Sequence, residues 1–183
     1  MTKQKTPWIE TTALRITRVH FAYIAFYAFA VVIFDTWNLL THEAVAQRWT
    51  AAAIMLVLTT VLWYATRLNI LSSARHLIII WAIIISDILF ASWNVYNTRG
   101  MASKAVALFF VPIITAALLK SRSTLLAATS FSVAGYSLAA VRYFNLHYGE
   151  GYRVELYGEV FFYSAMFFVA SWLLMIFFTS TKE

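Results

Sequence analysis

Six long apolar runs constrain this chain more than any other feature. Each has about 17 residues or more, which is enough for a helix to cross the hydrocarbon core of a bilayer. The runs cover residues 19–41, 50–66, 77–97, 101–119, 124–144 and 157–179. Only helices and closed barrels satisfy their backbone hydrogen bonds in lipid, and barrel strands alternate polar and apolar residues over about ten positions. The sequence therefore predicts an all-α, polytopic membrane protein with six transmembrane helices.

The composition agrees with a membrane protein and excludes several other classes. Of the 183 residues, 62% are hydrophobic and 12% are charged, whereas soluble domains have roughly 45–50% and 25%. The absence of cysteine excludes disulfides, thiolate metal sites, iron–sulfur clusters and cysteine nucleophiles. The net charge of +6 comes from basic residues scattered at the ends of the apolar runs. We therefore expect the lipid bilayer, and no nucleic acid, as a partner.

The distribution of Lys and Arg predicts the orientation in the membrane. Six helices place both termini on one side, and cytoplasmic loops carry an excess of basic residues. Nine of the 14 Lys and Arg fall on the side of the termini, namely Lys3, Lys5, Arg15, Arg18, Arg67, Arg75, Lys120, Arg122 and Lys182. The others are Arg48, Arg99, Lys104, Arg142 and Arg153. Both termini are therefore predicted to be cytoplasmic, in a multi-pass protein of the bacterial inner membrane.

Three segments divide the chain. Residues 1–18 are expected to form a basic cytoplasmic segment, residues 19–179 the transmembrane domain, and residues 180–183 a cytoplasmic tail that could begin a linker to an output domain. The first apolar run is too long for a signal-peptide core of about 7–15 residues, and it contains Asp35, so we expect it to be retained.

Polar side chains inside the predicted helices gather in the half away from the termini. Burying such groups in hydrocarbon costs free energy, so each needs a packing or functional reason. The predicted ligand-binding or sensing residues are Asp35, Asn38, Asp87, Asn94, Lys104, Arg142, Glu155 and Glu159. They would form either a structural network that holds the helices in register or an outward-facing pocket for a small ligand, a proton or an ion.

Opposite charges at similar depth suggest ion pairs within this set. Asp35 or Glu159 could pair with Lys104 or Arg142, and low dielectric makes such pairs sensitive to geometry. For Asp87 a functional role is favoured, because an acid near the middle of the bilayer cannot reach the headgroups with a long side chain. A protonated Asp87 bonded to Asn or Ser remains the structural alternative.

A short polar break separates the third and fourth runs. Asn97-Thr98-Arg99-Gly100 reads as a turn, and Pro112 lies within the run that follows. Proline removes one helical hydrogen bond, so we expect Pro112 to kink a continuous helix over residues 101–119. Gly100 and Pro112 are the predicted hinge positions.

Enzyme and metal motifs are missing from the sequence. Gly135-Tyr136-Ser137-Leu138 lacks the second glycine of the GxSG motif of intramembrane serine proteases, and the chain has no P-loop, HExxH or paired-aspartate motif. His42 and His147 lie near Glu43 and Glu150, but no HxxxH or HxxE pair shares one helix. We therefore predict no catalytic activity, no cofactor and no metal site.

The polar break resembles part of a known family. Asn97-Thr98-Arg99-Gly100-Met101-Ala102-Ser103, an apolar helix with Pro112, the basic turn Lys120-Ser121-Arg122 and a helix with Tyr136 look like the six-helix membrane input domain of bacterial sensor histidine kinases of the type IV pilus and nitrogen-regulation sort. The chain has one glycine where that pattern has two, and Lys104 where a proline often stands.

This resemblance implies a sensory module of two-component signalling. Such a module would form a homodimer and relay an extracytoplasmic or intramembrane stimulus through its sixth helix to a cytoplasmic kinase output domain. Any kinase domain would lie beyond residue 183.

Two other functions remain open at this point. Six helices in 183 residues are similar to the substrate-binding subunit of vitamin-uptake transporters of the energy-coupling-factor type. The AxxxA docking face of those proteins is missing, because no two of Ala22, Ala25, Ala28 and Ala30 are four apart. A structural membrane protein without a ligand would need only the packing role of the polar cluster.

Overall fold

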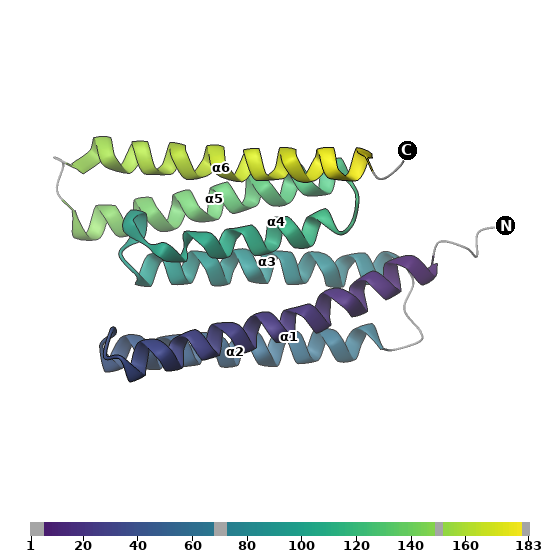
Figure 1. Cartoon of the computed structure of the whole chain (residues 1–183), viewed down its shortest axis with the longest axis horizontal. Helices are drawn as coiled ribbons and strands as arrows, with labels where there is room; N and C mark the ends of the chain where they lie inside the picture. Colours follow the sequence, from purple (N-terminus) through teal and green to yellow (C-terminus); the bar gives the residue numbers. More distant parts are fainter. Residues whose placement is uncertain (1–5, 68–72, 149–151, 181–183) are drawn as a thin grey trace. The chain divides into compact units, whose positions relative to one another are not determined.

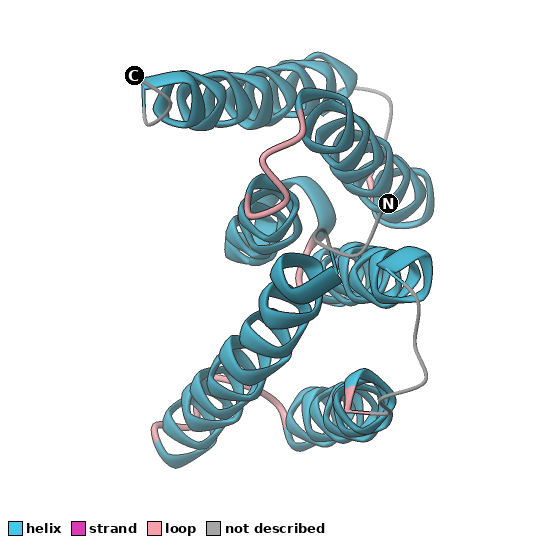
Figure 2. Ribbon diagram, turned by 90° about the vertical axis from the view of Figure 1, so that its right-hand side faces the viewer, coloured by secondary structure: helices cyan, strands magenta, loops and turns pink. Residues whose placement is uncertain are grey.

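The computed structural model describes residues 6–67, 73–148 and 152–180, and all regular structure within these ranges is helical (Figure 2). Figure 1 labels the six α-helices. The helical segments in chain order are α1 Thr6–Thr36, α2 His42–Thr66, α3 Ser73–Asn97, the 3-10 segments η1 Gly100–Ala102 and η2 Lys104–Phe109, α4 Phe110–Ala117, α5 Arg122–His147 and α6 Arg153–Ser180. Five of them, α1, α2, α3, α5 and α6, are long and apolar enough to cross a membrane. This confirms the all-α prediction and agrees with a multi-pass membrane protein.

The helix ends differ from the predicted runs at several points. α1 begins at Thr6, so residues 6–18 belong to the first helix, and it ends at Thr36 rather than at residue 41. Asn38 lies in the turn that follows, with a left-handed φ of 51° that asparagine tolerates better than most residues. Residues 1–5 of the predicted basic segment and 181–183 of the predicted tail lie outside the described residues. Glu150 does too.

Residues 1–83 form the first of two compact units. In it α1 and α2 run antiparallel and pack along their lengths (Figure 1). The rings of Phe21 and Trp63 meet edge to face, with centroids 6.2 Å apart, and the Arg48 guanidinium lies 5.5 Å from the centroid of the Phe34 ring. Thr41 caps α2, because its hydroxyl accepts the Ala44 N–H at 3.3 Å. An aromatic contact thus joins the middle of α1 to the end of α2, and a cation–π contact joins the end of α1 to the start of α2.

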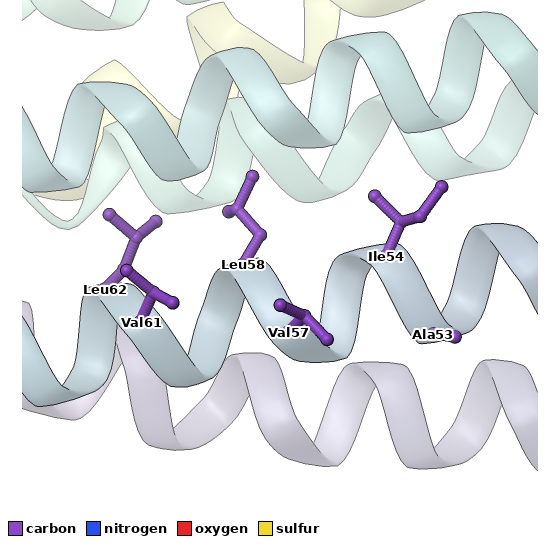
Figure 3. A pocket seen from close by; sticks show the side chains of 6 residues that line it. All are labelled: Ala53, Ile54, Val57, Leu58, Val61 and Leu62. Atoms are coloured by element: carbon purple, nitrogen blue, oxygen red, sulfur yellow. The ribbon is translucent and has the colours of Figure 1, made fainter.

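An apolar hollow of about 530 Å³ follows one face of α2 (Figure 3). Its lining consists of Ala53, Ile54, Val57, Leu58, Val61 and Leu62, which recur at helical spacing. No polar side chain lines this hollow. It therefore has the character of a surface that contacts apolar groups, and no chemistry can be assigned to it.

Residues 84–183 form the second unit, and its centre is aromatic. Phe109 of η2, Tyr136 of α5 and Phe167 of α6 are all fully buried, and their ring centroids lie 5.7 to 6.1 Å apart. Phe110 of α4 adds an edge-to-face contact with Phe167 at 5.3 Å. These four rings connect η2, α4, α5 and α6, and we call them the aromatic core. Each such pair contributes about 0.5–1.5 kcal/mol beyond its buried area.

Gly135 permits a close approach between α5 and α3. A Cβ atom at this position would lie 2.8 Å from Ser92 Oγ and 2.9 Å from Ile88 Cγ2. Ser92 has little freedom to move away, because its hydroxyl donates a hydrogen bond of 2.8 Å to the Ile88 carbonyl. Only glycine therefore fits where these two helices cross.

The fourth apolar run is not one continuous helix, so the prediction for residues 101–119 is wrong. It consists of two 3-10 segments, η1 and η2, followed by the short α4. Pro112 is the third residue of α4, where its missing N–H has no partner within the helix. An α-helix continued backward would bring the proline ring against the Leu108 carbonyl. The predicted kink is instead a change from 3-10 to α geometry just before Pro112.

We predict that Gly135→Ala destabilises the protein. The new methyl group would overlap Ser92 and Ile88, and overpacking of this kind costs about 1–3 kcal/mol. Gly158→Ala is the matched control, since a Cβ there meets no atom within 4 Å and alanine is the better helix former by about 1 kcal/mol. Unfolding of both variants in detergent micelles measures the difference, and equal stabilities would contradict the packing at Gly135.

Candidate functional site

A chain of hydrogen bonds leads from α3 to η2. The Asn94 amide donates to the Phe90 carbonyl at 2.9 Å, and the Thr98 hydroxyl donates to the Asn94 carbonyl at 2.6 Å. The hydroxyls of Thr98 and Ser103 are hydrogen-bonded to each other. Ser103 Oγ also accepts the Ala105 N–H at 3.1 Å and so caps η2. The end of α3 and the start of η2 are therefore joined through Ser103.

The turn between α3 and η1 is packed tightly against α5. Arg99 and Gly100 both have left-handed backbone angles, with φ of 78° and 60°. A Cβ on Gly100 would lie 2.6 Å from Tyr143 Cδ1 and 2.7 Å from its Cβ. Gly100 is thus required both for its backbone conformation and for the space it leaves to Tyr143. Gly100, one of the two predicted hinge positions, therefore lies in a turn that is fixed by its packing against Tyr143 of α5.

Tyr143 is also the centre of an aromatic group at this end of α5. Its ring meets Tyr96 edge to face at 6.1 Å and stacks on His147 at 4.1 Å with an interplanar angle of 13°. The Arg142 guanidinium lies 5.7 Å from the centroid of Tyr96. A cation above an aromatic face is attracted by the ring quadrupole, so Arg142 is oriented toward α3.

The first turns of α6 and the 3-10 turn η1 enclose a hollow of about 330 Å³. Its lining consists of Met101, Ala102, Glu155, Gly158 and Glu159, and we call it the acidic hollow. Glu155 and Glu159 are one helical turn apart and therefore share one face of α6. Glu155 is exposed, whereas Glu159 is partly buried and lies close enough to Tyr136 to interact with it electrostatically. Two carboxylates at this spacing repel each other and give the hollow a negative electrostatic potential, which attracts a cation.

Apart from Arg142, which lies beside Tyr96, the predicted site residues of the second unit fall into three groups. Glu155 and Glu159 both line the acidic hollow. Asp87 and Asn94 are buried on α3, with 1% and 4% of their surface exposed. Lys104 opens η2 as an exposed residue.

Glu159 was expected to form an ion pair with Lys104 or Arg142. Within residues 84–148 and 152–180, no salt bridge joins Glu159 to Lys104 or Arg142. Asp35 and Asn38 lie in the first unit, where both are exposed. In the described part of the chain, no three His, Cys, Asp or Glu side chains lie close enough to hold a metal ion.

Several residues of this region were missed by the sequence analysis. Ser103 carries a recognisable signal, because serine directly before a helical segment is a preferred capping residue. Thr98 and Ser103 both flank the polar break and could have been paired on that ground. Nothing in the local sequence indicates that Tyr143, 43 residues later, packs against Gly100. Contacts between residues this far apart in the sequence cannot be predicted from composition or residue spacing.

We predict opposite responses to substitution at two adjacent residues of this turn. Gly100→Ala would combine a left-handed alanine, which costs about 1–2 kcal/mol, with overlap against Tyr143. Arg99→Gly would be neutral or slightly stabilising, because Arg99 already has a positive φ and an exposed side chain. Thermal unfolding in micelles compares the two variants. Equal losses of stability would show that the turn is not held in this way.

Comparisons with known proteins return nothing: no family model, no curated protein and no solved structure matches this chain. The resemblance to the input domains of sensor kinases therefore rests on the residues between Asn97 and Tyr136 alone. The function has to follow from the acidic hollow, the locked turn beside it and the course of α6.

Proposed function

We propose that this chain is a signal-sensing input domain of the bacterial inner membrane that relays a stimulus through α6. The observation that carries the proposal is the course of this helix. α6 begins at the acidic hollow, passes the aromatic core at Phe167 and continues without a break to Ser180. One rigid element thus connects a polar cluster at one end to the far end of the described chain.

The stimulus would act at the acidic hollow. A proton or a cation that neutralises Glu155 or Glu159 removes their mutual repulsion and changes the force on the first turns of α6. The opposite wall is η1, which the contact between Gly100 and Tyr143 holds against α5. The change is therefore taken up by α6, as a shift of a few ångström at most.

The burial of α6 supports such a movement. Only 11% of its apolar window is buried, against 56% for α3 and 39% for α5. A helix with few buried contacts can be displaced at low cost in free energy. The same exposed surface leaves room for a second copy of the chain. We propose a homodimer with a cytoplasmic kinase output domain as the partner of α6.

Six membrane crossings with both termini in the cytoplasm belong to this proposal. Besides the five long helices, the remaining crossing, fourth in chain order, would be Lys104–Ala117, which is apolar but shorter than the other five. Its six 3-10 residues rise about 2.0 Å each and its eight α-helical residues about 1.5 Å each, so together they reach roughly 24 Å. With the turns at either end, this length approaches the roughly 30 Å of the hydrocarbon core.

A second candidate is the substrate-binding component of a small-solute uptake system. The interrupted fourth run favours it, because discontinuous helices at membrane depth often form the substrate sites of transporters. In that case the acidic hollow would bind a cationic solute, and α6 would not need an output partner.

We predict that Glu159→Gln changes the output of a kinase core joined in helical register after α6. Loss of one carboxylate in the hollow should alter autophosphorylation by roughly fivefold or more, the usual size of coupling between two sites. Glu43→Gln, at an exposed glutamate of α2, is the control and should leave the activity unchanged.

The measurement is phosphate incorporation by the fusion protein reconstituted in lipid vesicles. If the double variant Glu155→Gln and Glu159→Gln matched the unsubstituted fusion, the sensing proposal would be wrong. Uptake of a cationic solute that depends on Glu159, with an unresponsive kinase, would instead establish the transport function.

A further inference from the structure

We infer that η2 is a conformational switch, in which Lys104–Phe109 converts between 3-10 and α geometry and thereby moves the aromatic core against α6. The inference rests on the proposed relay through α6 and supplies its moving part. It starts from an unusual feature, because 3-10 segments longer than three or four residues are uncommon and η2 has six. η2 forms the start of the helical segment Lys104–Ala117, and 3-10 geometry at a helix start is common only in shorter pieces.

The residues of η2 themselves favour an α-helix. Lys104, Ala105, Ala107 and Leu108 are among the best helix formers. The observed 3-10 geometry is therefore held by the neighbours of η2 and not by its own sequence. Such a disagreement between local preference and surroundings narrows the free-energy gap between the 3-10 and α conformations of the segment.

Structural features on both sides of η2 stabilise its longer 3-10 geometry. On its carboxyl side, Pro112 cannot donate to the Leu108 carbonyl and its ring crowds that carbonyl, so α geometry in η2 carries a cost in free energy. On its amino side, Ser103 caps the segment and is bonded to Thr98, while Gly100 is locked against Tyr143. Loosening either end would let the segment shorten.

The conversion would have a defined size and direction. A 3-10 helix rises about 2.0 Å and turns about 120° per residue, whereas an α-helix rises about 1.5 Å and turns about 100°. Six residues would therefore shorten by about 3 Å and unwind by about 120°. The amino end is held at η1, which packs on α5, so the carboxyl end has to move.

The moving end contacts α6 directly. Phe109 is the last residue of η2 and Phe110 the first of α4, and their ring centroids lie 5.7 and 5.3 Å from that of Phe167. η2 also begins two residues after Ala102, which lines the acidic hollow. The segment thus links the hollow to the point where the core holds α6.

The test uses the absence of cysteine, since spin labels then attach only at introduced positions. One pair, Ala102→Cys and Ile114→Cys, spans η2, and a control pair, Leu126→Cys and Leu138→Cys, spans the same number of residues within the continuous α5. All four positions are exposed. Distances are measured by double electron–electron resonance in phosphatidylcholine–phosphatidylglycerol nanodiscs.

Pro112→Ala should shorten the distance across η2 by about 3 Å and leave the distance across α5 unchanged. Ser103→Ala, which releases the other end, should shift it in the same direction and decides the question if the proline variant does not fold. An unchanged distance across η2 in both variants, with the α5 distance intact, would overturn the switch.

A third pair, Leu126→Cys and Phe177→Cys, reports on α6 relative to α5. Its distance should change together with the shortening of η2. Shortening without any change at α6 would overturn the link between the switch and α6. If η2 does not shorten but Glu159→Gln still alters the fused kinase, the switch fails while the proposed sensing function stands.

Discussion

The close packing of Gly100 against Tyr143 determines the arrangement of the second unit. Two successive left-handed residues turn the chain sharply after α3, and the missing side chain of Gly100 lets the turn rest on α5. η1 is thereby placed where it can line the acidic hollow with α6. The fourth run must then reach from this anchored turn to the aromatic core, and the longer rise of η2 serves that span.

Several hydroxyl and amide groups in the long helices are satisfied within their own helix. The hydroxyls of Thr36, Thr60, Ser92 and Thr129 each donate to the carbonyl four residues earlier, and the Asn94 amide does the same. This local bonding meets the demand of a medium that offers no water. A polar residue in an apolar run therefore does not by itself indicate a binding site. The pair Glu155 and Glu159 differs, because carboxylates cannot donate to a helix carbonyl and instead face a hollow.

The lengths of the apolar runs predicted much of the fold, and the failures have physical causes. The third run was expected over 77–97, and α3 indeed ends at Asn97, where the polar turn begins. The prediction of one continuous helix for the fourth run failed because hydropathy does not distinguish 3-10 from α geometry. The place of Pro112 in the first turn of α4 also depends on where that helix starts, which the sequence does not indicate. In the site, Glu155 and Glu159 are one helical turn apart and both line the acidic hollow, whereas the role predicted for them remains a prediction. The partners of Gly100 and Arg142 were not predictable, since both contacts join residues far apart in the sequence.

The way α6 is held explains why a small change at its start could matter at its other end. Phe167 lies near the middle of this helix and contacts aromatic rings from η2, α4 and α5, whereas most of the helix surface is exposed. α6 also packs along α5, and both Leu156 near its start and Ser171 beyond Phe167 are buried. In the proposed relay, two changes would act on the same helix: one at its start, through Glu155 and Glu159, and one near its middle, through a displacement of Phe109. Because α6 continues without a break from the hollow to Ser180, the proposed relay needs no second element to carry a displacement from the hollow past the aromatic core.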